Sequence, residues 1–420
     1  MDEYVYWIWL SLACSPGGAT FGRLLEKFSS AKEIYDADCE ELSRIVGYRS
    51  SDRNALSDRN LDKAKEIYNF CRRHRVGLLS YADEGYPNSL REISSPPVLL
   101  YYRGVLPDFN NKFAASVVGT RALSDYGRRS AFRISYDLAM SGAIIVSGMA
   151  CGIDGVSHAG ALAAGGITVA VLGSGIDVCY PDQHRRLAQE IVKCGCVMTE
   201  YAPGTKPMRY NFPKRNRIIS GLSAATLVIE GKEKSGAYIT ANYAKEQERA
   251  VYALPGNVGS KTSELTNLLI KGGARLCTCA DDIVRYFLDK YPGKLNPFKL
   301  PELTRLDFMS VLRELSVVAV CSGDDIFIPS RQKPLKAAAS LPKALETEEE
   351  TLSQVVEPPS DFDKTALAVY KRIPVSGDIS LEELTDSEIN LRQVMKALLK
   401  LEMGGFIRML PADRVTRKTN

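Results

Sequence analysis

The chain has 420 residues, of which 45% are hydrophobic and 25% are charged, and its formal net charge at pH 7 is +4. These are ordinary values for a globular protein, and the length predicts two or three domains. Because the net charge is small, binding of an acidic polymer would have to depend on local clusters of basic residues. No apolar run approaches the ~18 residues of a membrane span, and the acidic start MDEY is unlike a secretory signal. We therefore expect a cytoplasmic protein without a membrane segment.

The first segment, residues 1–75, is predicted to be a small helical domain. Apolar residues recur at spacings of three and four in FGRLLEKF, AKEIYDA, ELSRIV and AKEIYNFCRRH. Short turns, SPGGAT and VGYRSS, separate these stretches. A compact bundle of this kind resembles helix-hairpin-helix or sterile-alpha-motif modules, which often contact DNA or proteins. A plain packing domain fits the pattern equally well.

Residues 76–290 alternate between apolar strands and amphipathic helices. The candidate strands are VGLLSY, PVLLYYRG, AASVVGT, AIIVSGMA, ITVAVLGSG, CVMTEY, ATLVIEG, AVYALPG and ARLCTC. The helical stretches between them include YGRRSAFRISYDLAMSG, DGVSHAGALAAGG, DQHRRLAQEIVKCG and YITANYAKEQE. Continuous apolar strands separated by helices are typical of a parallel sheet covered on both faces. The sequence therefore predicts an α/β fold with an extended, Rossmann-like, doubly wound sheet.

The last third of the chain has two parts. Residues 291–360 combine an insertion without a clear structural pattern with a stretch rich in Pro, Ala and charge, which is typical of a flexible linker. Residues 361–420 regain helical periodicity in LAVYKRI, ISLEELT and INLRQVMKALLKLEMGG, followed by the strand-like FIRML. This order predicts a winged-helix-like domain.

Ten cysteines are scattered along the chain, a pattern that fits reduced thiols better than a disulfide framework. Two Cys-x-Cys pairs, at 194/196 and 277/279, leave a metal site open as an alternative. Each pair lies in a segment expected to be a strand, where a spacing of two places both side chains on one face. Zinc sites usually have a Cys-x2-4-Cys spacing. We therefore favour buried thiols and expect neither a metal nor a cofactor.

Glycine and hydroxyl residues are concentrated where the predicted strands end. Such loops are Gly119-Thr120-Arg121, the segments 147–155 and 173–177, Lys234-Ser235-Gly236, and Pro255-Gly256-Asn257. In an open parallel sheet the carboxyl ends of the strands form the ligand-binding edge, and glycine lets backbone N–H groups approach an anion closely. No G-x-G-x-x-G fingerprint and no G-x4-GK[ST] loop is present. The loops therefore favour a phosphate-containing ligand without a dinucleotide fold or a P-loop.

The segment NFPKRNR is interpreted as a rigid basic loop near the same edge. Lys214, Arg215 and Arg217 surround Asn216 and would extend one phosphate pocket into a track for several phosphates. Phe212, or Tyr210 beside it, could stack on a base. This combination suits single-stranded nucleic acid better than a mononucleotide. Alternatively, Arg217 pairs internally with one of the two glutamates, at 200 and 230, that end predicted strands.

Few residues stand out as catalytic groups. His158 lies in a helix of small residues and is expected to be packed or capping, whereas His184 is expected to face solvent or to assist a phosphate contact. Asp154 and Asp177 each follow a Gly-Ile pair, where a helix N-cap is the simplest role. Neither of the strand-ending glutamates has an obvious acid/base partner. The sequence shows no Ser-His-Asp order and no metal triad.

Several motifs together resemble one family. They are SVVGTR, SGMACGIDGVSHAGAL, GSGIDVCYPDQHRRL, TEYAPGTKP, NFPKRNRIISGLSAATLVIEGKEKSGAYITANYA, ALPGNVGS and LIKGGA. In order and spacing, across about residues 80–290, they resemble the DNA-processing protein A (DprA/Smf) family. Cys151 and the pair Glu264-Leu265 depart from the usual pattern, which has small or glycine residues there.

The resemblance implies a non-enzymatic, homodimeric protein that binds and protects incoming single-stranded DNA. It also implies that the protein loads the RecA recombinase in natural transformation and DNA processing. The DNA contacts that the motifs imply, together with the ring and turn noted above, are Arg121, Ser147, Gly148, Gly173, Ser174, Phe212, Lys214, Arg215, Asn216, Arg217, Lys234, Ser235, Gly236 and Asn267.

Two other functions remain as alternatives. The first is a nucleotide-processing hydrolase of the lysine-decarboxylase-like Rossmann group, whose PGGxGTxxE motif supplies a glutamate for cleavage. The corresponding stretch here, SGAYITANY, has Asn242 and Tyr243 but no acid after Thr240. The second alternative is an adaptor that acts only through the winged-helix-like domain, which would leave the glycine loops unexplained.

Overall fold

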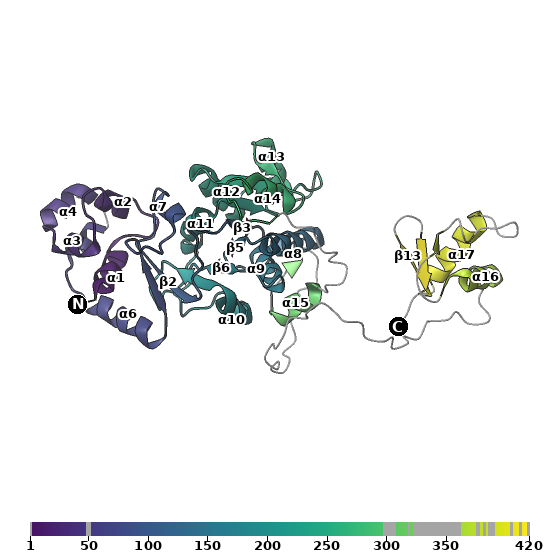
Figure 1. Ribbon diagram of the computed structural model, residues 1–420, viewed down its shortest axis with the longest axis horizontal. Coiled ribbons are helices and arrows are strands. Elements are labelled where there is room, and N and C mark those ends of the chain that lie inside the picture. The colour runs from purple at the N-terminus through teal and green to yellow at the C-terminus, as the bar shows by residue number, and fades with distance from the viewer. Residues whose placement is uncertain are drawn as a thin grey trace. The chain divides into compact units, whose positions relative to one another are not determined.

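A computed structural model describes residues 2–47, 52–296, 308–317, 320–321, 363–374, 379–380, 384, 391–403, 406–410 and 414–417 (Figure 1). The chain divides into two compact units, residues 1–331 and 332–420. Within the described part of the chain, no helix combines the length and the apolar character that crossing a bilayer requires.

The N-terminal helices form a bundle that is continuous with the main core of the first unit. They are α1 (Glu3–Ala13), α2 (Thr20–Leu25), α3 (Ala31–Asp36), α4 (Cys39–Val46), α5 (Asp52–Ser57) and α6 (Asp62–Arg73). Side chains of Asp2, Ser30 and Asp38 cap α1, α3 and α4 by accepting backbone N–H groups. Trp7 and Trp9 of α1 are buried in the same hydrophobic cluster as strand residues of the sheet. The helical character predicted for this segment is therefore confirmed for its described residues, 2–47 and 52–75, whereas its status as a separate domain stays a prediction.

A nine-stranded mixed sheet forms the centre of the first unit. Its strands are β1 (Gly77–Ser80), β2 (Leu99–Gly104), β3 (Ala114–Val118), β5 (Ile144–Ser147), β6 (Thr168–Val171), β7 (Cys196–Thr199), β8 (Ala225–Val228), β9 (Ala250–Ala253) and β10 (Arg275–Leu276). Their order is β1-β2-β7-β6-β5-β3-β8-β9-β10. The strands from β7 to β10 in this order run parallel, and β2 is antiparallel to both of its neighbours. All nine coincide with predicted strands.

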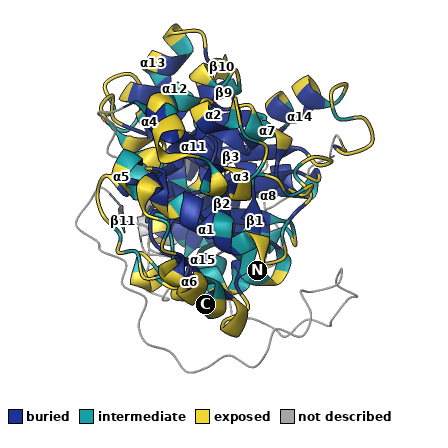
Figure 2. Cartoon of the chain, turned by 90° about the vertical axis from the view of Figure 1, so that its left-hand side faces the viewer, coloured by how far each residue is buried: buried dark blue, intermediate teal, exposed yellow. Residues whose placement is uncertain are grey.

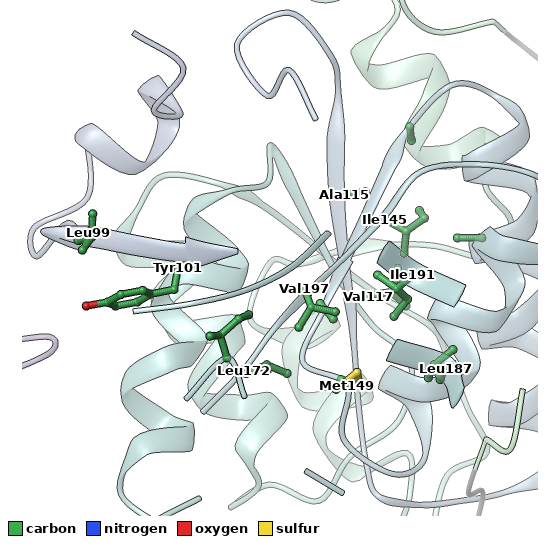
Figure 3. Close-up of a cluster of buried hydrophobic side chains, with 14 of the residues drawn as sticks. Leu99, Tyr101, Ala115, Val117, Ile145, Met149, Leu172, Leu187, Ile191 and Val197 are labelled. Atoms are coloured by element: carbon green, nitrogen blue, oxygen red, sulfur yellow. The ribbon is translucent and has the colours of Figure 1, made fainter. Parts of the chain in front are cut away.

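Helices cover both faces of this sheet. Side chains of α8 (Asp125–Met140), α9 (Ile153–Ala163), α10 (Arg185–Cys194) and α14 (Asp281–Phe287) pack into one hydrophobic cluster. Those of α7 (Asn88–Arg91), α11 (Asn211–Gly221), α12 (Gly236–Glu246) and α13 (Glu264–Lys271) pack into the other. Because side chains alternate along a strand, Ala115 and Val117 belong to the first cluster and Ala114 and Val118 to the second. Figure 3 shows Ala115 and Val117 in the first cluster. The predicted α/β, Rossmann-like, doubly wound fold is confirmed.

Part of the unassigned insertion also belongs to the first unit. Helix α15 (Phe308–Glu314) packs against α9, and the short strand β11 (Val320–Cys321) pairs in parallel with β4 (Ala122–Leu123). Leu312 and Val317 are buried in the cluster that includes α8 and α9. This stretch therefore extends the cover over one face of the sheet.

The second unit has its own small core. It contains α16 (Lys364–Arg372), β12 (Ile379–Ser380), α17 (Leu391–Met403), β13 (Ile407–Leu410) and β14 (Arg414–Arg417). The strands form an antiparallel sheet in the order β12-β14-β13. Val369, Leu398 and Val415 are among the residues buried in its core. The winged-helix fold stays a prediction, and the linker predicted in the later part of residues 291–360 lies outside the described residues.

One predicted loop is a helix. The segment NFPKRNRIISG forms α11, and Pro213 is tolerated because it lies in the first turn, where a backbone N–H has no partner in the helix. Figure 2 shows α11 and the strands of the sheet largely in the colour of buried residues, with exposed residues on the outer helices and loops. The interpretation of this segment as a rigid loop is therefore wrong.

Candidate nucleic-acid interface

The sheet changes its winding direction between β3 and β8. The chain leaves β3 through α8, on one face, and reaches β5, whereas it leaves β8 through α12, on the other face, and reaches β9. The connections that follow β3 and β8 therefore lead to opposite faces, and the crevice lies where they diverge, at the carboxyl edge of the sheet. Crevices at such switch points are the usual ligand sites of open α/β sheets.

A cavity of about 970 Å³ occupies this crevice, and we name it the crevice cavity. Its lining comes from the loops after β3, β5, β6, β7 and β8 and from residues of α9, α11 and α12. Three exposed basic side chains line it: Arg121, Arg209 and Lys234. The lining also includes three aromatic rings, those of Tyr180, Phe212 and Tyr238. Positive charge and rings thus converge on one site.

The N-terminus of α12 opens into the crevice cavity. Ser235 is the N-cap residue, but its side chain makes no capping hydrogen bond, and its buried Oγ has no hydrogen-bond partner in the described part of the chain. Ser235, Gly236 and Ala237 all line the cavity. An uncapped N-terminus presents free backbone N–H groups and a partial positive charge, which favour an anion.

Phe212 is the centre of an aromatic and cationic cluster in the cavity wall. The guanidinium carbon of Arg121 lies 5.7 Å from the centre of the Phe212 ring, and that of Arg215 lies 5.9 Å from it. The ring of Tyr180 is 5.4 Å away at an interplanar angle of 43°. Tyr180 remains 41% exposed, so a face of this cluster is available to a planar ligand.

Arg215 contributes positive charge from beneath the cavity, with its side chain buried. Its Nη1 donates to the carbonyl oxygens of Gly148, at 2.9 Å, and Val171, and its Nε donates to Asn216 Oδ1 at 3.2 Å. Asn216 Nδ2 in turn donates to the carbonyl oxygen of Gly236 at 3.2 Å. Burial lowers the pKa of Arg215 to about 10, so the guanidinium stays protonated at neutral pH. The two residues fix α11 to the loops and to the start of α12.

Arg217 does not belong to an exposed basic track. Its Nη1 and Nη2 donate to the two carboxylate oxygens of Glu200 at 2.8 and 2.7 Å, and both side chains are buried. Its Nε donates to the carbonyl oxygen of Ser95 at 2.9 Å. Burial alone would lower the pKa of Arg217, but the Glu200 carboxylate more than offsets this and the pKa is raised. The expected phosphate track is wrong at this residue, and the alternative of an internal ion pair is correct.

Four of the predicted residues in the glycine-rich loops contact other parts of the protein and are not open to a ligand. Ser147 Oγ donates to the carbonyl oxygen of Val117 at 2.7 Å, and Ser174 Oγ donates to that of Val178 at 2.9 Å. A Cβ at Gly148 would lie 2.7 Å from Arg215 Nη2, and one at Gly173 would lie 2.9 Å from the Phe212 ring. None of the four lines the crevice cavity. The two glycines therefore leave room for the side chains of Arg215 and Phe212.

Two further predicted contacts lie apart from the cavity. Lys214 is exposed on α11, but its side chain approaches Gly17 and does not line the cavity. Asn267 makes hydrogen bonds through both ends of its amide to the backbone of Gly256, at 3.1 and 3.4 Å. Of the predicted contacts, the structure gathers seven in the cavity lining: Arg121, Phe212, Arg215, Asn216, Lys234, Ser235 and Gly236.

Both histidines that were considered as functional groups are buried. His158 donates from Nδ1 to Thr168 Oγ1 at 2.7 Å, because the Thr168 hydroxyl proton is used on the carbonyl oxygen of Ile145. Burial lowers the pKa of His158 to about 3. His184 is fully buried and donates from Nδ1 to the carbonyl oxygen of Met149 at 2.9 Å, so the expectation that it faces solvent is wrong. Burial also lowers the pKa of His184. Both imidazoles are therefore neutral packing groups.

The acidic residues at the strand ends support loops. Asp154 lies in the first turn of α9, after the N-cap Gly152, and Asp177 accepts a hydrogen bond from Gly204 N at 2.8 Å in a loop. Neither is an N-cap, which corrects that expectation. Glu230 accepts hydrogen bonds from the backbone N and the Oγ of Ser124, at 2.9 and 2.5 Å. Its carboxylate thereby fixes the start of α8 to the end of β8.

The main residues that the sequence reasoning missed are Arg209, Tyr180 and Tyr238. Arg209 lies just before α11, in KPMRYNF, and the sequence interpretation assigned the basic site to the longer basic run that follows it. Its position in the segment that follows β7, at the predicted ligand-binding edge of the sheet, could have indicated it. Among the described residues, no group of three or more His, Cys, Asp or Glu side chains is arranged to hold a metal ion. Cys194 ends α10 and Cys196 begins β7, so the expectation that both lie in one strand is wrong.

Comparison with known proteins shows the family to which the chain is similar. A family model described as "DNA recombination-mediator protein A" matches residues 77–288, which include the whole sheet and the crevice cavity. Protein Smf of Synechocystis sp. is 31% identical over 424 residues, covering 99% of each chain. This chain belongs to the DNA recombination-mediator protein A family.

Two further relatives place the similarity within this family. The DNA processing protein DprA of Streptococcus pneumoniae is 42% identical over 208 residues, which cover 50% of this chain and 73% of the relative. The X-ray structure of DNA processing protein A from Streptococcus pneumoniae superposes with a TM-score of 0.59 at 33% identity, covering 68% of this chain and 98% of that chain. The resemblance to the DprA/Smf family expected from the motifs is thereby confirmed.

Proposed function

We propose that this protein binds single-stranded DNA in the crevice cavity during DNA processing. The observation that carries the proposal is the convergence of Arg121, Arg209 and Lys234 with an uncapped helix N-terminus and three aromatic rings in one cavity. The cations and the helix N-terminus suit phosphates, and the rings suit unstacked bases. Membership of a family described as recombination mediators supports a DNA ligand.

Single strands fit this cavity better than duplex DNA. In a duplex the bases are stacked and paired, so only the backbone and groove edges could reach the ring cluster at Phe212. A single strand can place a base on Tyr180 or Phe212 while its phosphates contact Arg121 and Lys234. Base stacking on aromatic side chains is tolerant of sequence, so binding should show little sequence preference.

Binding without catalysis is part of the proposal. The acid in the cavity lining, Asp154, is 8% exposed, and its Oδ2 accepts a hydrogen bond from Ala150 N at 3.4 Å. Burial raises the pKa of Asp154, and the positive charge of Arg215 opposes this shift. A hydrolase would need an accessible general acid or base here, and the neutral histidines at 158 and 184 are not in the cavity lining.

We further propose a homodimer that acts in the cytoplasm and loads the RecA recombinase onto the bound strand in natural transformation. Leu268, Leu276 and Tyr286 are 43%, 51% and 37% exposed near the β10 edge of the sheet. Large apolar side chains at an open sheet edge favour association with a second copy. A strict monomer in light scattering at micromolar concentration would contradict the dimer.

Fluorescence anisotropy tests the DNA-binding proposal directly. The wild-type protein should bind labelled oligo-dT at least about tenfold more tightly than the same strand annealed to oligo-dA, equivalent to about 1.4 kcal/mol. Replacing Arg121, Arg209 and Lys234 together by Ala should abolish most of this affinity. Lys65→Ala, at an exposed basic residue on α6, is the matched control and should bind as wild type. Equal affinity for duplex, or unchanged affinity in the triple variant, would contradict the proposal.

A further inference from the structure

A second cavity lies on the side of the sheet that α10 covers. It has a volume of about 350 Å³, and we name it the α10 cavity. Its apolar walls include Met149 and Leu172, at the ends of neighbouring strands, and Val192 of α10 (Figure 3 shows Met149 and Leu172). No residue lines both this cavity and the crevice cavity. The two cavities are therefore separate sites within the first unit.

The rim of the α10 cavity is positively charged. Three arginines line it, Arg75, Arg103 and Arg185, against one carboxylate, Asp177. Arg185 pairs with Asp182 at 2.5 Å on the exposed surface, and Asp177 already accepts a hydrogen bond from Gly204 N. The cavity thus has more cationic than anionic groups around an apolar interior.

Arg103 is the group that indicates a ligand. It is the next-to-last residue of β2, where it pairs in register with Val197, another residue of the cavity wall. Its Nε has less than 1 Å² of exposed surface and no hydrogen-bond partner in the described part of the chain. Buried polar groups almost always have a partner, and an unsatisfied charged donor costs more than a neutral one. Because Arg103 lines the cavity, an anion there would place a negative charge beside its guanidinium group and offset this cost.

We propose that the α10 cavity binds a small organic anion with an apolar body. The apolar part fills the space between α10 and the strand ends, and the anionic group accepts hydrogen bonds from Arg103, with Arg75 and Arg185 adding charge at the rim. Its volume lies at the lower end of the range of small-molecule sites, which combine mostly apolar walls with a few placed polar groups. This site is independent of DNA binding in the crevice cavity.

A pair of fluorescent probes tests the proposal on the full chain. The anion 1-anilinonaphthalene-8-sulfonate should bind saturably, and Arg103→Met should weaken its affinity about tenfold, because Met keeps an apolar stem but removes the charge. The neutral analogue N-phenyl-1-naphthylamine should bind both proteins about equally. Ala188→Phe, which places a ring from α10 into the cavity, should weaken both probes and decides the matter if Arg103→Met does not fold.

The crevice cavity supplies the control. Arg209→Met removes a charge there and should leave the affinity for 1-anilinonaphthalene-8-sulfonate unchanged. If Arg209→Met weakens the anionic probe as much as Arg103→Met does, the probe occupies the crevice cavity and the proposal is overturned. Unchanged affinity for this probe in both folded cavity variants, at 103 and 188, would overturn it as well.

Discussion

Replacing Arg217 by Met should destabilise the first unit strongly and leave the mode of DNA binding unchanged. The substitution removes both donors from the Glu200 carboxylate, which is 9% exposed and would be left as a buried charge without its partner. Removing one partner of a buried ion pair costs about 3–5 kcal/mol. The hydrogen bond to Ser95 is lost as well.

A double-mutant cycle measures this effect. Glu200→Leu alone should also be costly, because it leaves the Arg217 guanidinium buried and unpaired. The double variant Glu200→Leu/Arg217→Met should recover most of the loss, since replacing both charges of a buried pair by apolar groups is often nearly neutral. A coupling free energy of at least about 2 kcal/mol is expected.

Urea denaturation followed by tryptophan fluorescence is a suitable assay. Both tryptophans of the chain, Trp7 and Trp9, lie in α1, and residues at the end of α1 line a small cavity together with Glu200 and Arg217. The tryptophan fluorescence therefore reports on the contact between α1 and the region around the Glu200–Arg217 ion pair. If Arg217→Met remained within about 1 kcal/mol of wild type but lost DNA affinity and salt dependence, the structural role argued for Arg217 would be refuted.

Three further predictions follow from buried or strained positions and from one exposed residue. Lowering the pH from 7 to 5 should destabilise the first unit by about 2 kcal/mol through His158, because its folded-state pKa of about 3 keeps it neutral while the unfolded chain takes up a proton below pH ~6.5. The free energy of unfolding that this group contributes is thus present above pH ~6.5 and is lost as the pH falls toward 3. In a His158→Gln variant, the free energy of unfolding should therefore fall less between pH 7 and pH 5 than in the wild type. Gly152→Ala should cost more than about 2 kcal/mol in urea unfolding, because φ is +83° and the new Cβ would lie 2.4 Å from the carbonyl oxygen of Thr120; wild-type stability would contradict this. Lys214→Ala should keep oligo-dT affinity within about twofold, since this exposed side chain lies outside the crevice cavity, and a tenfold loss in anisotropy would show that the strand extends over α11.

The sheet could be predicted from sequence because its signal is local. Runs such as SVV, AIIV and ATLVI are apolar except for a single small hydroxyl residue in two of them, as suits strands covered on both faces, and each is followed by a glycine, hydroxyl or acidic residue. These ends lie at one edge in a parallel sheet. The edge, and the residues Arg121 and Lys234 on it, therefore followed from the pattern of strands alone.

The role of α11 could not be predicted in the same way. Its buried face consists largely of polar residues, including Arg215, Asn216 and Arg217, so the helix lacks the apolar periodicity by which helices are recognised. Whether an arginine is exposed or paired depends on what lies opposite it in space. Glu200 is 17 positions away in sequence, and the contact forms only because the fold brings the residue after β7 against α11.

The salt dependence of oligo-dT binding tests the central claim most directly. Each phosphate contact on a single strand contributes ~0.7 to the slope of log affinity against log salt concentration. Removing Arg121, Arg209 and Lys234 together should therefore flatten the wild-type slope by about 2 units and weaken binding at every salt concentration, with unfolding unchanged. A folded triple variant that keeps the wild-type slope would contradict the assignment of the crevice cavity as the DNA site.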